Sequence, residues 1–206
     1  VVYGARISLL VGILALVVGL LIGVTIGLLS GYYGGTIDII GMRFIDLLLS
    51  FPGILLAILL SATFGSGLFP VILAIGMYSV PTFSRITRGS VLAIKGRGFV
   101  EAARALGAST PRILVRHVLF NILGPILVYT TLRMGSAVLT TAYLSFLGVG
   151  VAPPTPEWGL MLNTARNFMR EAPHVILFPG VAIFISVLAF NILGDGLRDL
   201  FDVKQQ

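Results

Sequence analysis

The sequence has no cysteine and few charged residues. Without cysteine the chain forms neither a disulfide nor a thiolate metal site, so cysteine usage gives no information on its compartment. Charged residues make up 11% of the 206 residues, against roughly 25% in a typical soluble domain, while 57% are hydrophobic and the mean hydropathy is +1.04. Polar side chains cannot cover the surface of so apolar a chain, and we expect lipid to cover much of it.

Charge is absent altogether from residues 7–37, 47–84 and 175–194. About 20 apolar residues cross the hydrocarbon core of a membrane as a helix. Residues 47–84 would form a helix about 57 Å long, which is too long for one crossing, and Gly65, Gly67 and Pro70 offer a turn within them. We therefore predict an all-α polytopic membrane protein, with a single transmembrane domain over residues 1–206. Its five predicted helices span residues 7–30, 39–64, 68–86, 118–147 and 174–196.

Sequence signatures of catalysis are also missing. There is no GxxxxGK[ST] phosphate-binding loop, so the chain does not hold ATP by that route. His117 and His174 lie far apart and lack the HExxH spacing of a zinc site. No Ser–His pair or pair of carboxylates stands out within the predicted spans. We predict a non-catalytic chain with no cofactor or metal of its own.

The net charge of +6 is concentrated in one segment. Between residues 85 and 117 only Glu101 opposes seven basic residues, which are Arg85, Arg88, Lys95, Arg97, Arg104, Arg112 and Arg116. The loop over 148–173 is balanced, with two arginines and two glutamates. The positive-inside rule therefore places the loop over 87–117 and the C-terminus in the cytoplasm, and the loop over 148–173 outside. Membrane spans flank the basic loop on both sides, which disfavours nucleic-acid binding.

Counting spans back from this loop puts Val1 on the outer side of the membrane. The first residue is not methionine, and no signal sequence precedes the first span. We expect a truncated or processed form of a longer protein, with at least one membrane helix missing upstream.

The first span carries a glycine at every fourth position, Gly19, Gly23, Gly27 and Gly31. This spacing makes a groove without side chains along one helix face. Membrane helices associate through close backbone contact along such grooves, so we predict a helix-packing face.

Few charged groups lie within the predicted spans. Arg43 and Asp46 are three residues apart and are predicted to pair on one helix face. Arg133 lies in the middle of an otherwise apolar span, where a charge is costly and does not face lipid. Two roles fit Arg133, and the sequence does not choose between them: it lines a water-filled route, or it pairs with an acid of a partner.

The basic loop reads as a short helix, a turn and a second helix. Phe99 to Leu106 are good helix formers, and Gly107 is a suitable C-terminal stop. Ser109 or Thr110 then caps a second helix with Pro111 in its first turn. One side of the first helix is apolar, through Phe99, Val100, Ala103 and Leu106. Either the membrane surface or another protein must cover this side.

The run Glu101-Ala-Ala, then Gly107, Ile113 and His117, resembles the EAA loop of importer-type ABC permeases. In that family the loop forms a coupling helix, which sits in a groove of the ATP-binding subunit. The resemblance assigns ATPase coupling to Phe99, Glu101, Ala102, Ala103, Arg104, Leu106 and Gly107.

Motifs along the rest of the chain are similar to the C-type permease of dipeptide and oligopeptide importers. They include Tyr3-Gly-Ala-Arg-Ile-Ser8, Gly31-Tyr-Tyr-Gly-Gly35, Pro153-Pro-Thr-Pro-Glu-Trp-Gly159 and Asn191-Ile-Leu-Gly-Asp-Gly-Leu-Arg-Asp199. One departure is Phe120, where the family usually has proline before the asparagine at 121. The resemblance implies a type I importer core of six helices, the first of which would precede Val1, in a bacterial or archaeal cell membrane. It also implies a second homologous permease subunit, two ATP-binding subunits that hold ATP and Mg, and an extracytoplasmic solute-binding protein.

The outer loop is a second expected contact site. Its prolines stiffen it, and Trp158 is an amphipathic residue suited to an interface. The resemblance makes Pro154, Glu157 and Trp158 candidates for contact with the solute-binding protein. The alternative is a plain helix at the membrane interface.

The sequence thus predicts a permease subunit of an ATP-driven importer that forms half of the translocation path. Peptides are the leading substrate class, with nickel or another small solute as the alternative. The alternative function is a self-sufficient secondary transporter or channel, which would place ionisable relays or broken helices at the midplane.

Overall fold

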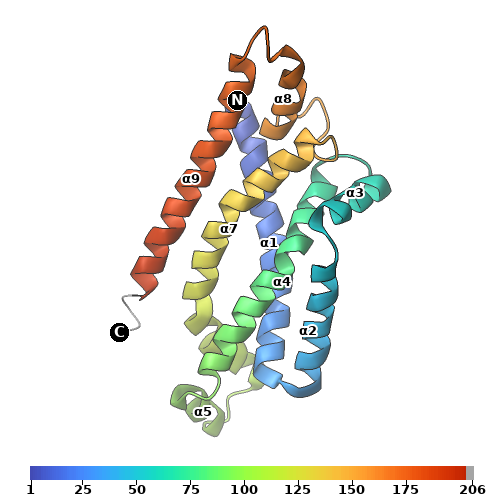
Figure 1. The fold of residues 1–206 in the computed structure, drawn as a ribbon. Coiled ribbons are helices and arrows are strands. Elements are labelled where there is room, and N and C mark those ends of the chain that lie inside the picture. Colours follow the sequence, from blue (N-terminus) through green and yellow to red (C-terminus); the bar gives the residue numbers. More distant parts are fainter. Residues whose placement is uncertain (203–206) are drawn as a thin grey trace.

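The computed structural model describes residues 1–202, and the regular elements in that range are all helical (Figure 1). Four helices are long and apolar enough to cross a membrane: α1 (Val2–Tyr33), α4 (Leu68–Ile94), α7 (Phe120–Phe146), which continues the short α6, and α9 (His174–Asp202). The shorter elements are α2 (Gly35–Ser50), α3 (Gly53–Phe64), α5 (Gly98–Ala105), α6 (Thr110–Arg112), the π-helix η1 (Ile113–Leu119), α8 (Trp158–Ala165) and the 3-10 helix η2 (Arg166–Phe168). The basic loop with α5 lies at one end of the bundle, and α8 lies at the other (Figure 1).

One predicted span is not a continuous helix. The chain bends by 84° between α2 and α3, so the prediction of one helix over 39–64 is wrong. Pro52 lacks a backbone N–H and disfavours helical geometry at the preceding residue, and Phe51 is extended (φ −86°, ψ 122°). The described residues give five spans only if α2 and α3 together count as one broken span.

The four spaced glycines of α1 lie against α4. A Cβ atom at Gly19 would stand 2.8 Å from the Ser79 Cβ, and one at Gly31 would stand 2.8 Å from the Val91 Cβ. Gly76 on α4 returns the contact, because its Cβ would stand 3.0 Å from the Ala15 carbonyl oxygen. The two backbones are therefore closer than side chains would permit, which is how membrane helices gain packing energy without a hydrophobic drive.

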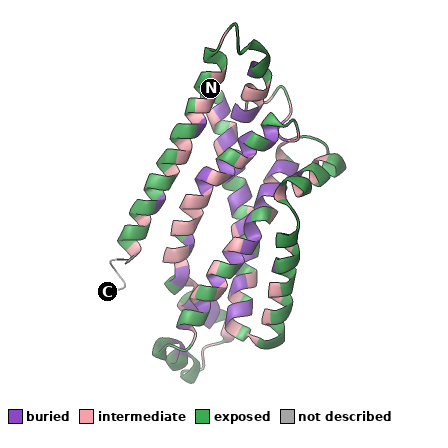
Figure 2. Ribbon diagram, in the orientation of Figure 1, coloured by how far each residue is buried: buried purple, intermediate pink, exposed green. Residues whose placement is uncertain are grey.

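Burial is concentrated on α1, α4 and α7 (Figure 2). Two apolar clusters result. One fills the half of the bundle near α8 and includes Val11, Phe83 and Trp158, and the other lies near α5 and includes Val91, Val100 and Ile122. Helices α2 and α9 are mostly exposed and lie at the sides of the bundle (Figures 1 and 2).

Candidate functional site

Helix α5 forms the tip of the basic end, beyond the ends of α4 and α7 (Figure 1). It stops at Gly107, whose φ of +78° is a conformation that favours glycine. The Gly107 N–H donates to the Arg104 carbonyl (3.0 Å), and the Ala108 N–H donates to the Ala103 carbonyl (3.1 Å). These two bonds are the Schellman arrangement, so the predicted stop at Gly107 has the geometry of a true helix C-terminus.

The apolar residues of α5 do not all face the same way. Val100 (0% exposed) and Ala103 (8%) pack into this chain's own core, whereas Leu106 is 88% exposed. Glu101, Ala102 and Phe99 are also exposed. Ala103 is therefore not available as a contact for another subunit, contrary to the expectation from sequence. The free apolar surface of α5 is at its two ends, Phe99 and Leu106.

Cation contacts attach the basic loop to the end of α1. The Arg104 Nη2 donates to the Tyr32 hydroxyl (3.1 Å), and its guanidinium carbon lies 5.9 Å from the centre of the Tyr32 ring. That hydrogen bond raises the pKa of the already basic Arg104 guanidinium. The Lys95 Nζ donates to the Gly31 carbonyl at the α1 terminus (3.0 Å). Arg104 thus has a partner inside the chain, besides its exposed surface.

The helix leading from the loop into the bundle contains a π-helical segment, η1. Such segments are rare and change the backbone hydrogen-bonding ladder. The Asn121 Nδ2 donates to the His117 carbonyl (2.6 Å) at the end of this segment. Phe120, which stands where the family usually has proline, directly follows η1. This π-helical segment joins α6 to α7 without a break in the helix.

Ion pairs join α2 to α4, and the sequence did not indicate their partners. Arg88 donates two hydrogen bonds to Asp38 (2.6 and 2.5 Å), and Arg85 donates one to Asp46 (2.9 Å). The predicted pairing of Asp46 with Arg43 is wrong, because Asp46 faces α4 instead. Apart from these pairs α2 has little attachment, since only Ile45 of its residues is buried.

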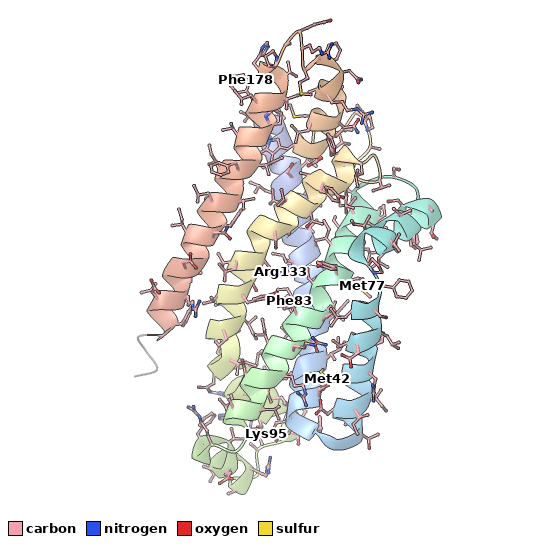
Figure 3. All side chains as sticks on the ribbon, viewed as in Figure 1. Met42, Met77, Phe83, Lys95, Arg133 and Phe178 are labelled. Atoms are coloured by element: carbon pink, nitrogen blue, oxygen red, sulfur yellow. The ribbon has the colours of Figure 1, made fainter. Side chains whose placement is uncertain are left out.

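Arg133 lies at the middle of α7, between α7 and α4 (Figure 3). Its guanidinium carbon stands 5.6 Å from the centre of the Tyr78 ring and 5.8 Å from that of the Tyr129 ring. The Tyr129 ring meets Phe83 edge to face at 5.4 Å. The two tyrosines therefore hold the cation by their π faces.

Arg133 belongs to a polar stripe on α7 that the sequence analysis missed. The stripe consists of Tyr129, Arg133, Ser136, Thr140 and Tyr143, at alternating spacings of four and three residues. Tyr143 is exposed and the other four are half-buried, so the stripe lies at the edge of this chain's packed core. The spacing was visible in the sequence, but hydroxyl groups alone are weak evidence because they bond their own helix carbonyls, as Thr140 does with Ser136.

The outer loop is held by two of its predicted contact residues. Glu157 is fully buried, where it accepts hydrogen bonds from the Ser8 hydroxyl (3.1 Å) and the Leu160 N–H (2.9 Å). Trp158 is 3% exposed, and its indole N–H donates to the Val1 carbonyl (3.0 Å). Neither side chain presents surface to another protein, contrary to expectation. Pro154 is exposed and lines a groove of about 350 Å³ beside α8.

Comparison with known proteins relates the chain to transport-system permeases. The family described as binding-protein-dependent transport system inner membrane component matches residues 23–205. The chain is 52% identical, over 204 residues, to the glutathione transport system permease protein GsiD of Escherichia coli O1:K1, covering 99% of this chain and 67% of that protein. It is 51% identical to the same-named protein of Pectobacterium atrosepticum, covering 99% of this chain and 68% of that protein.

Solved structures share the fold at low identity. An inward-facing form of the MetNI methionine ABC transporter matches with a TM-score of 0.77 at 21% identity, covering 97% of this chain and 94% of that one. An amino acid ABC transporter matches with a TM-score of 0.72 at 18% identity, covering 96% of this chain and 92% of that one. The chain therefore belongs to the family of inner membrane components of binding-protein-dependent transport systems, as a non-catalytic permease component of an ABC transporter.

Proposed function

We propose that this chain is one permease subunit of an importer for short peptides, and that α5 couples it to an ATP-binding subunit in the cytoplasm. The high identity to permeases named for glutathione transport, over 99% of this chain, carries the choice of substrate class. Glutathione is itself a tripeptide. A second permease subunit then completes the path, and an extracytoplasmic binding protein delivers the peptide.

The exposed surface of α5 supports the coupling role. Leu106 and Phe99 leave apolar area at the two ends of the helix, and Glu101 lies between them on an exposed position. Val100 and Ala103 meanwhile fix α5 to the bundle core. A push on the exposed side of α5 would therefore pass into the α4 and α7 ends through rigid packing. An apolar patch of this kind on a polar end is typical of a protein contact.

Two substitutions test the coupling role separately from folding. In the complex purified with its ATP-binding subunits, Glu101→Arg combined with Leu106→Ser should release those subunits and abolish uptake. The thermal stability of the permease pair should stay unchanged, because both side chains are exposed. Glu171→Arg, a charge reversal in the exposed outer loop, serves as the matched control and should retain the ATP-binding subunits.

Retained stoichiometric ATP-binding subunits and normal uptake in the double variant would refute the role of α5. Substrate class is tested by uptake of labelled glutathione and of a dipeptide into proteoliposomes that hold the whole complex, with the binding protein inside or outside the vesicles as orientation requires. Transport of Ni²⁺ but of neither peptide would refute the proposed substrate class.

A further inference from the structure

Arg133 carries a positive charge, and no acid among the side chains described for residues 1–201 pairs with it. Asp38 and Asp46, both on α2, pair with Arg88 and Arg85 instead. The Arg133 Nε is buried without a hydrogen-bond partner. Among the described residues the faces of Tyr78 and Tyr129 hold the guanidinium, and they leave its charge and its terminal Nη donors without a partner.

Two cavities lie along α7, one on each side of Arg133 in the sequence, and neither is lined by Arg133 itself. A cavity of about 290 Å³ lies on the α8 side, lined by Tyr78, Thr140 and Tyr143. Another of about 510 Å³ lies on the α5 side, lined by Arg97, Asn121 and Pro125 among others. Since α7 runs through Pro125, Arg133 and Thr140 in that order, Arg133 stands between the two cavities along the helix.

The charge of Arg133 disfavours contact between this side of α7 and hydrocarbon. A charge at the middle of a membrane helix faces a water-filled cavity or a partner, and here the polar positions extend four residues to one side of Arg133 and ten to the other, from Tyr129 to Tyr143. A water-lined face of α7 would account for the whole stripe, whereas pairing with one acid would account for Arg133 alone.

We propose that Arg133, held between Tyr78 and Tyr129, binds the carboxylate of the peptide during its passage; this rests on the proposed function. Every peptide with a free C-terminus carries an α-carboxylate, with an ordinary pKa of about 3.3–3.7, so it is ionised at neutral pH. The planar guanidinium can grip both oxygens of that group at once. A path needs sites that bind weakly enough to release the peptide, and one guanidinium at this depth meets this need.

The test uses the whole complex in proteoliposomes, supplied with saturating binding protein preloaded with a dipeptide, so that capture does not limit the rate. Arg133→Gln should lower the maximal uptake rate about tenfold or more, since a hydrogen bond to a charged group is lost. Arg133→Lys, which keeps the charge but not the planar fork, should give an intermediate rate. Leu127→Gln places the same amide on an exposed position of α7 outside the stripe, and should leave uptake within twofold of the unmodified complex.

The same measurement with the C-terminal amide of the dipeptide separates charge recognition from general damage. Arg133→Gln should reduce the preference for the free acid over the amide. An unchanged rate for the free acid in Arg133→Gln would overturn the inference. Dissociation of the permease pair in that variant would also overturn it, in favour of an acid on the partner subunit. Failure of the unmodified complex to transport any peptide would instead overturn the proposed function.

Discussion

The contact between α1 and α4 predicts a measurable cost for one added methyl group. A Cβ at Gly23 would stand 2.6 Å from the Phe83 Cβ and 2.7 Å from the Val80 carbonyl oxygen. Carbon atoms pack best at about 3.5–4.0 Å, so Gly23→Ala must separate the helices by about 1 Å. The Val80 oxygen is backbone, and no rotamer change removes it from the way.

The magnitude follows from how much packing this separation removes. A gap of about 0.5–1 Å already forfeits a quarter to a half of each contact energy, and it opens along the neighbouring glycines as well. Overpacking of this kind costs about 1–3 kcal/mol in protein cores. Alanine in place of glycine favours a helix by roughly 1 kcal/mol, which offsets part of that cost. Because the close Val80 oxygen is backbone, we take the upper part of the overpacking range, about 2–3 kcal/mol. We therefore expect a net loss of about 1–2 kcal/mol for Gly23→Ala and failure of assembly for Gly23→Leu.

The assay is thermal denaturation of the purified complex in lipid nanodiscs. The measured quantity is the fraction of complex that remains monodisperse at each temperature. Gly89→Ala is the matched control, because Gly89 lies on α4 with nothing within 4 Å of its Cβ position. The control should keep or slightly raise the melting temperature, while Gly23→Ala should lower it by about 2–8 °C. Equal melting temperatures for the two variants would refute the packing argument.

Three further changes test other contacts. Gly107→Ala forces a side chain into a φ of +78°, at a cost of about 1–2 kcal/mol, and should weaken binding of the ATP-binding subunits in pull-down; unchanged binding would count against the turn. Glu157→Ala leaves the Ser8 hydroxyl and the Leu160 N–H without the carboxylate, so hydrogen exchange over residues 158–162 should rise, whereas retained protection there would show that the carboxylate is dispensable. Asp38→Asn should raise exchange across α2 but not α4, because α2 loses its doubly hydrogen-bonded pair; equal exchange in both forms would contradict this.

The fold could be predicted largely from one-dimensional signals. Uncharged runs located the long helices, and Gly107 marked the end of α5. The helices are longer than predicted where they continue past the apolar run, as α4 does beyond residue 86 through Arg88 to Ile94. Proline could not be interpreted from sequence alone, because Pro81 lies inside a helix whereas Pro52 ends one.

The candidate sites were predicted less well, for a physical reason. Residue type indicates whether a side chain suits an interface, but burial depends on which elements meet. Glu157 and Trp158 suit a surface by type and are buried because Ser8 of α1 and Val1, just before α1, lie beside them. Asp46 had an acceptable partner within its own helix and took one from α4 instead.

The π-helical segment η1 determines how α7 is rotated relative to α5. A π-helix has more residues per turn than an α-helix, so η1 sets the rotation of α7 about its own axis. That rotation decides the direction in which Tyr129 and Arg133 point. One residue corresponds to about 100° of rotation on an α-helix. Deleting one residue within Ile113–Leu119 would therefore leave α5 and α7 intact as helices but rotate α7 by about 100° about its axis relative to α5.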